Sequence, residues 1–142
     1  MKHAQRGTST AEFAIAATLM LMVVFGIIQF GKAIYAYHSV ANAARLGSRW
    51  AMVRGSDCVA ATCPATAATV KAYVQSQMPL LNSAAATVTT TWSTSSGCYG
   101  NPSNGPGCVV AVTVSYPFHF DVPLVSSAVL QISSTSQMVI SE

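Results

Sequence analysis

A single carboxylate, Glu12, stands at the edge of a long apolar run near the beginning of the chain. The run from Phe13 to Gly31 carries no formal charge, and as a helix it would span roughly 28 Å, about the hydrocarbon thickness of a bilayer. A carboxylate at the edge of a membrane helix is costly without a partner. Either Glu12 lies at the headgroup level near the positive end of the helix dipole, or it pairs with an α-amino group created by cleavage after Gly7. The spacing from Gly7 to Glu12 and the apolar run together favour the pairing.

Four cysteines fall into two local pairs, Cys58 with Cys63 and Cys98 with Cys108. Paired cysteines in a small chain fit an oxidising compartment. The sequence allows three pairings, and two local disulfides are the simplest of them. The spacings lack the C-x2-C pattern of structural zinc sites, so we expect no metal here.

Catalytic chemistry has little support in the rest of the chain. Beyond the apolar run the side-chain acids are Asp57, Asp121 and Glu142. They form no pair suited to acid–base work, and neither a Ser-His-Asp order nor a phosphate-binding glycine loop emerges. The net charge of +3 provides no basic face for nucleic acid. We therefore expect a protein that is not an enzyme, has no cofactor and does not bind nucleic acid.

The beginning of the chain is similar to a prepilin segment, and the whole chain resembles the TadE-like minor pseudopilins of the tight-adherence (Flp) type IV pilus systems. The likeness is strong over residues 6–51 and weaker to the end. It is carried by Arg6-Gly7, Glu12-Phe13-Ala14, the GIIQFG sequence of residues 26–31, the AARLGSR sequence of residues 43–49 and the tail from Ser133 to Glu142.

The resemblance implies a processing site and an assembly site. Gly7 would precede the bond cut by a membrane-embedded prepilin peptidase, and Thr8 would become the new N-terminus. Many type IV pilins carry Phe or Met first, so Thr8 departs from that pattern. Glu12, followed by Phe13, would be the assembly carboxylate, which meets the terminal amine of a neighbouring subunit.

The implied function is that of a minor pseudopilin in the initiation or assembly of a Flp-type adhesive pilus. Its partners would be the inner membrane, the prepilin peptidase, other pilin or pseudopilin subunits and the pilus assembly machinery. One alternative is an uncleaved, signal-anchored periplasmic module that binds a partner through the loop of residues 93–107. A pseudopilin of type II secretion is another.

The elements that position these residues begin with one long helix. We expect a leader over residues 1–7, a helix over 8–54 with its membrane part at 8–31, and a periplasmic domain over 55–142. Lys2 and Arg6 precede the apolar run and favour a cytoplasmic N-terminus in the bacterial inner membrane. Beyond the membrane, a polar stripe lies opposite a face of small residues, which packs on the chain's own domain, on helices of other subunits, or on both. The stripe is His38, Asn42, Arg45 and Arg49; the small face is Ala33, Ala36, Val40, Ala43, Ala44, Gly47 and Ala51.

The outer domain is expected to be α+β and pilin-like, with three or four antiparallel strands packed on the long helix. A second helix is expected from Pro64 to about Met78. Strands are expected over 84–92, 109–116 and 131–140. Pro117 kinks the middle strand, which could continue over 118–122, and residues 124–130 form a connection with a helical turn. In the strands, Val110, Val112 and Val114 should face one way, with Ile132, Met138 and Ile140 inward.

Overall fold

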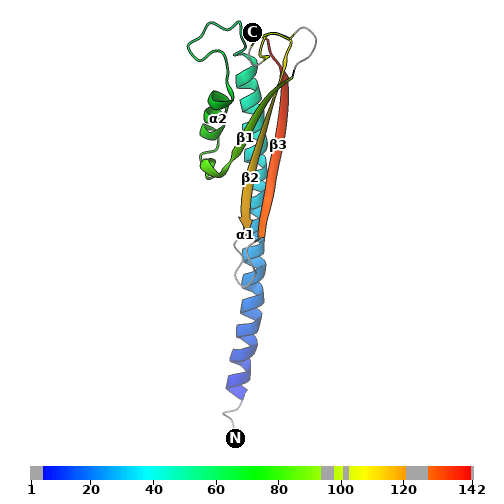
Figure 1. Cartoon of the computed structure of the whole chain (residues 1–142). Coiled ribbons are helices and arrows are strands. Elements are labelled where there is room, and N and C mark those ends of the chain that lie inside the picture. The colour runs from blue at the N-terminus through cyan, green and yellow to red at the C-terminus, as the bar shows by residue number, and fades with distance from the viewer. Residues whose placement is uncertain (1–4, 94–97, 101–102, 121–127, 142) are drawn as a thin grey trace.

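The computed structural model describes residues 5–93, 98–100, 103–120 and 128–141. A long helix, α1 (Gln5–Met52), is followed by a short helix, α2 (Ala67–Ser76), a 3-10 turn, η1 (Ser83–Ala85), and three strands. The strands are β1 (Thr87–Ser93), β2 (Val109–Phe120) and β3 (Ala128–Val139). Figure 1 shows the strands lying along the C-terminal part of α1, while its N-terminal part extends beyond them. The predicted α+β, pilin-like arrangement is confirmed.

Helix α1 is one uninterrupted helix of 48 residues, about 72 Å long. It contains no proline and is rich in alanine, which favours helix throughout. It ends at Met52, two residues before the expected bound, and its start at Gln5 includes both Gly7 and Thr8. Within the described residues, α1 has the length and composition needed to cross a membrane.

The sheet is antiparallel with the order β1-β2-β3. In its register Val88 pairs with Val114, which in turn pairs with Ser134. Alternate residues of β2 point to the helix side, and the predicted inward residues Val110, Val112 and Val114 are fully buried. Ile132 and Ile140 are buried as well, and Met138 packs partly buried against the same core. The middle of the opposite face of the sheet is polar and uncharged, with Thr113 and Thr135 joined through their hydroxyls at 2.8 Å.

The middle strand extends beyond Pro117, as the sequence allowed, whereas the last strand begins earlier than expected. Strand β2 continues without interruption through Pro117 to Phe120, and β3 begins at Ala128, so residues 128–130 are strand and not a connecting turn. Because β1 begins at Thr87, opposite Ser115, β2 has a neighbour on one side only beyond that point. Proline is tolerated where its missing N–H faces no partner strand. Residues 121–127, the rest of the expected connection, lie outside the described residues.

The close fit of α1 to the sheet depends on small residues. Ala36, Ala43 and Ala44 are fully buried. A Cβ added at Gly47 would lie 2.5 Å from Val74 Cγ2 and 3.2 Å from Val112 Cγ1, so glycine is what lets α1 approach α2 and β2 so closely. The small-residue face of α1 is therefore covered by the chain's own domain.

Helix α2 is shorter than expected because a capping box defines its start. Thr66 Oγ1 accepts a hydrogen bond from the Thr69 backbone N–H at 3.3 Å, and Thr69 Oγ1 accepts one from the Thr66 N–H at 2.9 Å. Such a box satisfies backbone donors that a helix start leaves free. The helix therefore begins at Ala67 rather than at Pro64, and it turns the buried Val70 and Val74 toward α1.

Candidate processing and assembly segment

The predicted processing and assembly residues all lie in the N-terminal part of α1. Gly7 and Thr8 are helical, as are Glu12 and Phe13. The side chains of Glu12 and Phe13 are exposed, Phe13 to 74%. The part of the chain that the structure describes offers the Glu12 carboxylate neither an ion pair nor a hydrogen bond. The exposed carboxylate is therefore accessible from outside the helix.

The start of α1 gives the place of Glu12 relative to the helix N-terminus in the uncut chain. In the uncut chain the helix begins at Gln5, so Glu12 lies about two turns inside it. The favourable effect of a helix N-terminus fades within the first turn, which makes the dipole explanation weak for this form. In a chain cut after Gly7, Glu12 would lie one turn from the terminal amine of Thr8. Side chains in a helix point toward its N-terminus. In the cut chain, the Glu12 carboxylate would therefore lie near the level of its own terminal amine. The terminal amine of a neighbouring subunit in the same register would lie at that level too.

The helix around Glu12 is suited to lipid. Side chains of the apolar run such as Ile15, Leu19 and Ile27 are more than half exposed. The hydroxyl of Thr18 donates to the carbonyl of Ala14 at 2.8 Å, so it needs no partner from solvent. A helix that satisfies its own polar groups and exposes apolar side chains is the form in which a single segment crosses a bilayer.

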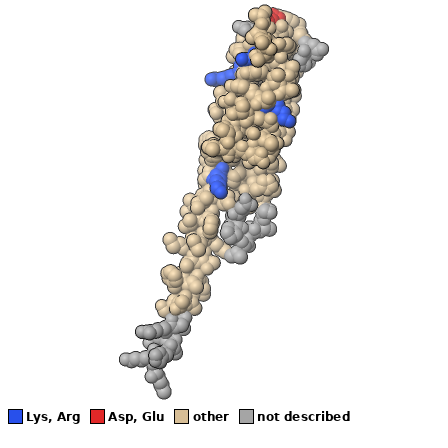
Figure 2. Space-filling view, turned by 90° about the vertical axis from the view of Figure 1, so that its left-hand side faces the viewer, with Lys and Arg blue, Asp and Glu red and all other residues tan. Residues whose placement is uncertain are grey.

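The polar stripe on the outer part of α1 is exposed as expected. His38, Asn42, Arg45 and Arg49 all lie on the face that the sheet leaves uncovered. On the side of the molecule shown in Figure 2, Lys and Arg side chains stand apart from one another instead of forming one patch. The stripe therefore lacks the concentrated charge that a nucleic-acid interface has.

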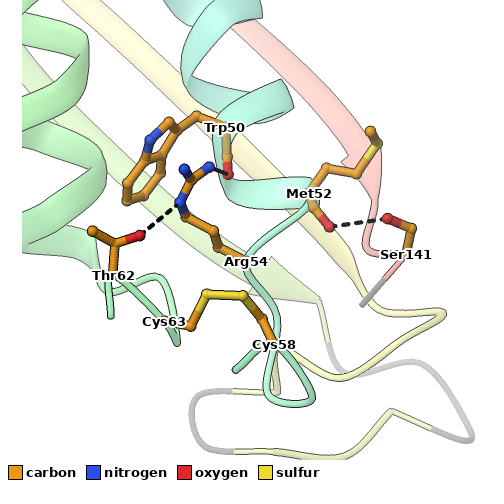
Figure 3. Close-up of a disulfide and its surroundings, with 7 residues drawn as sticks. All are labelled: Trp50, Met52, Arg54, Cys58, Thr62, Cys63 and Ser141. Atoms are coloured by element: carbon orange, nitrogen blue, oxygen red, sulfur yellow. Dashed lines mark hydrogen bonds between the residues drawn. A yellow bond between two sulfur atoms is a disulfide. The ribbon is translucent and has the colours of Figure 1, made fainter. Parts of the chain in front are cut away.

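At the far end of α1, Arg54 organises a junction that the sequence did not reveal (Figure 3). Its guanidinium lies 4.3 Å from the centroid of the Trp50 ring. It donates to the Trp50 carbonyl at 3.2 Å and to Thr62 Oγ1 at 3.1 Å. The opposite face of this indole is available for Tyr73 of α2, whose ring stacks at 5.3 Å. A cation that binds a carbonyl at a helix C-terminus stabilises that end, so the junction serves the fold. The i, i+4 spacing of Trp50 and Arg54 was its only signal in the sequence.

Both local disulfides favoured by the spacing, Cys58–Cys63 and Cys98–Cys108, are present. The first closes the turn beyond Arg54 (Figure 3). The second closes the loop proposed for the binding-module alternative, of which residues 94–97 and 101–102 lie outside the described residues. Among the residues that are described, no group of three or more His, Cys, Asp or Glu side chains is placed to hold a metal ion.

A tyrosine–carboxylate pair joins the segment just before Cys58 to the loop closed by the Cys98–Cys108 disulfide. The hydroxyl of Tyr99 donates to Asp57 Oδ2 at 2.6 Å. This hydrogen bond, with smaller contributions from desolvation and the negative charge, raises the pKa of Tyr99 above its ordinary value. A backbone hydrogen bond joins the same two segments, because the Ser56 N–H donates to the Asn104 carbonyl at 3.0 Å. This end of the molecule is thus held by cross-links and shows no catalytic arrangement of its described side chains.

A family model described as TadE-like protein matches residues 7–49. The matched segment starts at Gly7, contains Glu12, and includes most of α1 but none of the sheet. Comparisons with curated proteins and with solved structures give no match. Over its N-terminal helix, the chain is therefore similar to the TadE-like protein family.

Proposed function

We propose that the chain is a minor pseudopilin that acts in the initiation or assembly of a Flp-type adhesive pilus. The observation that carries the proposal is the TadE-like match over residues 7–49, which coincides with an uninterrupted helix whose first part is apolar and uncovered. The TadE-like family implies association with the pilus machinery of the tight-adherence system.

The first step is removal of residues 1–7 by a prepilin peptidase. The proposal is supported by Gly7 at the start of the matched segment and by the uncharged run that follows Glu12. Cleavage would also remove Lys2 and Arg6 and leave the new amine of Thr8 near the cytoplasmic surface. Residues 8–31 would then anchor the subunit in the inner membrane, with its domain in the periplasm. The basic residues before the run and the two disulfides support that orientation.

The second step is pairing between subunits. Glu12 is exposed and lacks a partner within the described part of its own chain, which supports a role between chains. In lipid, the low dielectric strengthens the attraction between a carboxylate and a protonated terminal amine. Either charged group alone is costly in that environment. The pairing would therefore favour entry of subunits in one register.

Two variants with matched controls test these steps in the native host. Gly7→Val should block maturation, so that the protein keeps its leader. Gly26→Val is its control, because a Cβ added at Gly26 meets no atom within 4 Å. Glu12→Gln should be processed normally but fail to support piliation, while Asp57→Asn changes a carboxylate in the outer domain and should support it. Normal processing of the Gly7 variant together with normal piliation of the Glu12 variant would overturn the proposal.

A further inference from the structure

The height at which the sheet meets α1 can be read from burial along the helix. Ile27, Ile28 and Phe30 are exposed, whereas Gln29 between them is only 8% exposed. From Ala33 onward, one face of α1 packs against the core of the domain. The domain thus begins to cover α1 at Gln29, before the uncharged run ends at Gly31.

The same stretch of α1 carries residues typical of a membrane surface. Lys32 is the first charged residue after Glu12, and Tyr35 and Tyr37 are 45% and 56% exposed. Tyrosine is enriched at the level of the lipid headgroups, and lysine extends its amine toward them. The end of the bilayer therefore falls close to the point where the sheet begins.

The part of the sheet at this height is apolar and uncovered. Figure 1 shows the ends of β2 and β3 beside the middle of α1, with the rest of the helix continuing past them. Here His119 pairs with Val129, and Phe118 pairs with Leu130. Val129 and Leu130 are 54% and 47% exposed although, as strand neighbours, they point to opposite faces of the sheet. Farther along β3, the next outer-face residues are Gln131, Ser133, Thr135 and Gln137.

We infer that this end of the sheet, residues 118–120 and 128–130, is a second contact with the bilayer, made at the headgroup level by Val129 and Leu130. The inference rests on the proposed membrane anchoring by α1. The exposed apolar side chains of the sheet end lie beside the part of α1 where its apolar run ends, and none of residues 118–120 and 128–130 is an acid or a Lys or Arg. A lipid surface is therefore the occupant that the chemistry fits. A second contact beside the helix would restrict the tilt of the domain relative to the membrane.

The chain provides a matched control for this contact. Val139 is the same residue type on the same face of β3, and its exposure of 57% is close to the 54% of Val129. Ten residues of strand separate the two, which is about 33 Å and more than the hydrocarbon thickness of a bilayer. Val129 and Val139 thus have the same residue type and similar exposure, and they differ in their distance from the proposed membrane surface.

The experiment places a photoreactive amino acid singly at Val129, Val139 or Leu19 of the full chain. Each protein is reconstituted in vesicles of phosphatidylethanolamine and phosphatidylglycerol, irradiated, and analysed by mass spectrometry for lipid adducts. Intact disulfides, checked on the same samples, confirm the fold. We expect lipid adducts at positions 19 and 129 and none at 139.

Adducts at position 19 with equal labelling at 129 and 139, whether both absent or both present, would overturn the second contact and leave the anchor intact. Absence of adducts at position 19 would overturn the anchor itself, and the second contact with it. The two failures are therefore distinguishable.

Discussion

The two halves of α1 bury their side chains in opposite ways. Up to Ile28 most described side chains are exposed although they are apolar, whereas between Ala36 and Ala51 one face is fully covered by the sheet and α2. The helix itself does not change, because the same hydrogen-bonded backbone runs through both halves. What changes is the environment that fits each half: the first has the length and composition to cross a membrane, and the second packs on the chain's own domain. A single helix thereby couples an anchor to a folded domain.

The largest difference between the halves should appear when glycine is enlarged. Gly47→Val places atoms against Val74 and Val112, both of which are fully buried, and overpacking of this kind costs about 3 kcal/mol. Gly26→Val should leave the stability of the domain nearly unchanged because its added Cβ meets nothing. Denaturant unfolding in detergent, followed through Trp50 and Trp92, measures both. Equal loss in the two variants would mean that α1 is not divided in this way.

Disulfides are confined to the end of the molecule farthest from the anchor, and their removal should affect the domain alone. In the chain-entropy model, replacing Cys98 and Cys108 by alanine should cost about 2–3 kcal/mol. Replacing Cys58 and Cys63 should cost roughly 0.6 kcal/mol less, because their sequence separation is 5 and not 10. The measurement is the free energy of unfolding of each double variant. The opposite order would contradict a contribution set by loop length.

Hydroxyl groups should also behave differently in the two halves. Ser48 is fully buried and its Oγ lies 2.8 Å from Ser136 Oγ of β3. Ser48→Ala leaves the Ser136 hydroxyl without this partner and should destabilise the domain by about 1 kcal/mol.

Thr18→Ala provides the control, since the Thr18 hydroxyl bonds only to its own helix and its loss should not move the unfolding midpoint. Replacing Ser48 and Ser136 together should cost little more than Ser48→Ala alone. Strictly additive losses would contradict a shared hydrogen bond.

The smallest effect concerns pH. The pKa of Tyr99 is raised in the folded chain above its ordinary value of 10.0 by the hydrogen bond to Asp57. At a pH between the pKa of Tyr99 in the unfolded chain and its higher pKa in the folded chain, the Tyr99 hydroxyl is therefore protonated more fully in the folded chain. The contribution of this bond is complete below about pH 10 and is lost as the pH rises through the folded pKa. Unfolding midpoints from pH 9 to 11 should fall more steeply for the native chain than for Tyr99→Phe; parallel curves would exclude the effect.

Most of the fold was predictable because its patterns are periodic. The alternating valines of β2 and the small face of α1 indicated which sides are buried, and both predictions are confirmed. The bounds of α2 and β3 were less accurate, since they depend on partners distant in sequence. The capping pair Thr66–Thr69 decides where α2 begins, and pairing with the end of β2 brings Ala128 into β3.

The candidate site also has features that the local sequence indicates and features that depend on contacts between distant residues. The order of Gly7, Glu12 and the apolar run is local, so it could be recognised without a structure, and the TadE-like match over residues 7–49 agrees with it. The junction of Trp50, Arg54 and Tyr73 could not be recognised, because Tyr73 reaches it only after α2 has packed against α1. The exposure of Val129 beside the anchor likewise depends on the pairing of β2 with β3.

The central claim is that the first half of α1 is the retained membrane segment of a processed prepilin. The most direct test is the intact mass and N-terminal sequence of the protein isolated from membranes of its own host. We predict a chain that starts at Thr8, retains the apolar run to Gly31 and contains two disulfides. A chain that starts at Met1 would contradict cleavage and favour an uncleaved anchor, and a start beyond Gly31 would contradict the membrane role of the segment altogether.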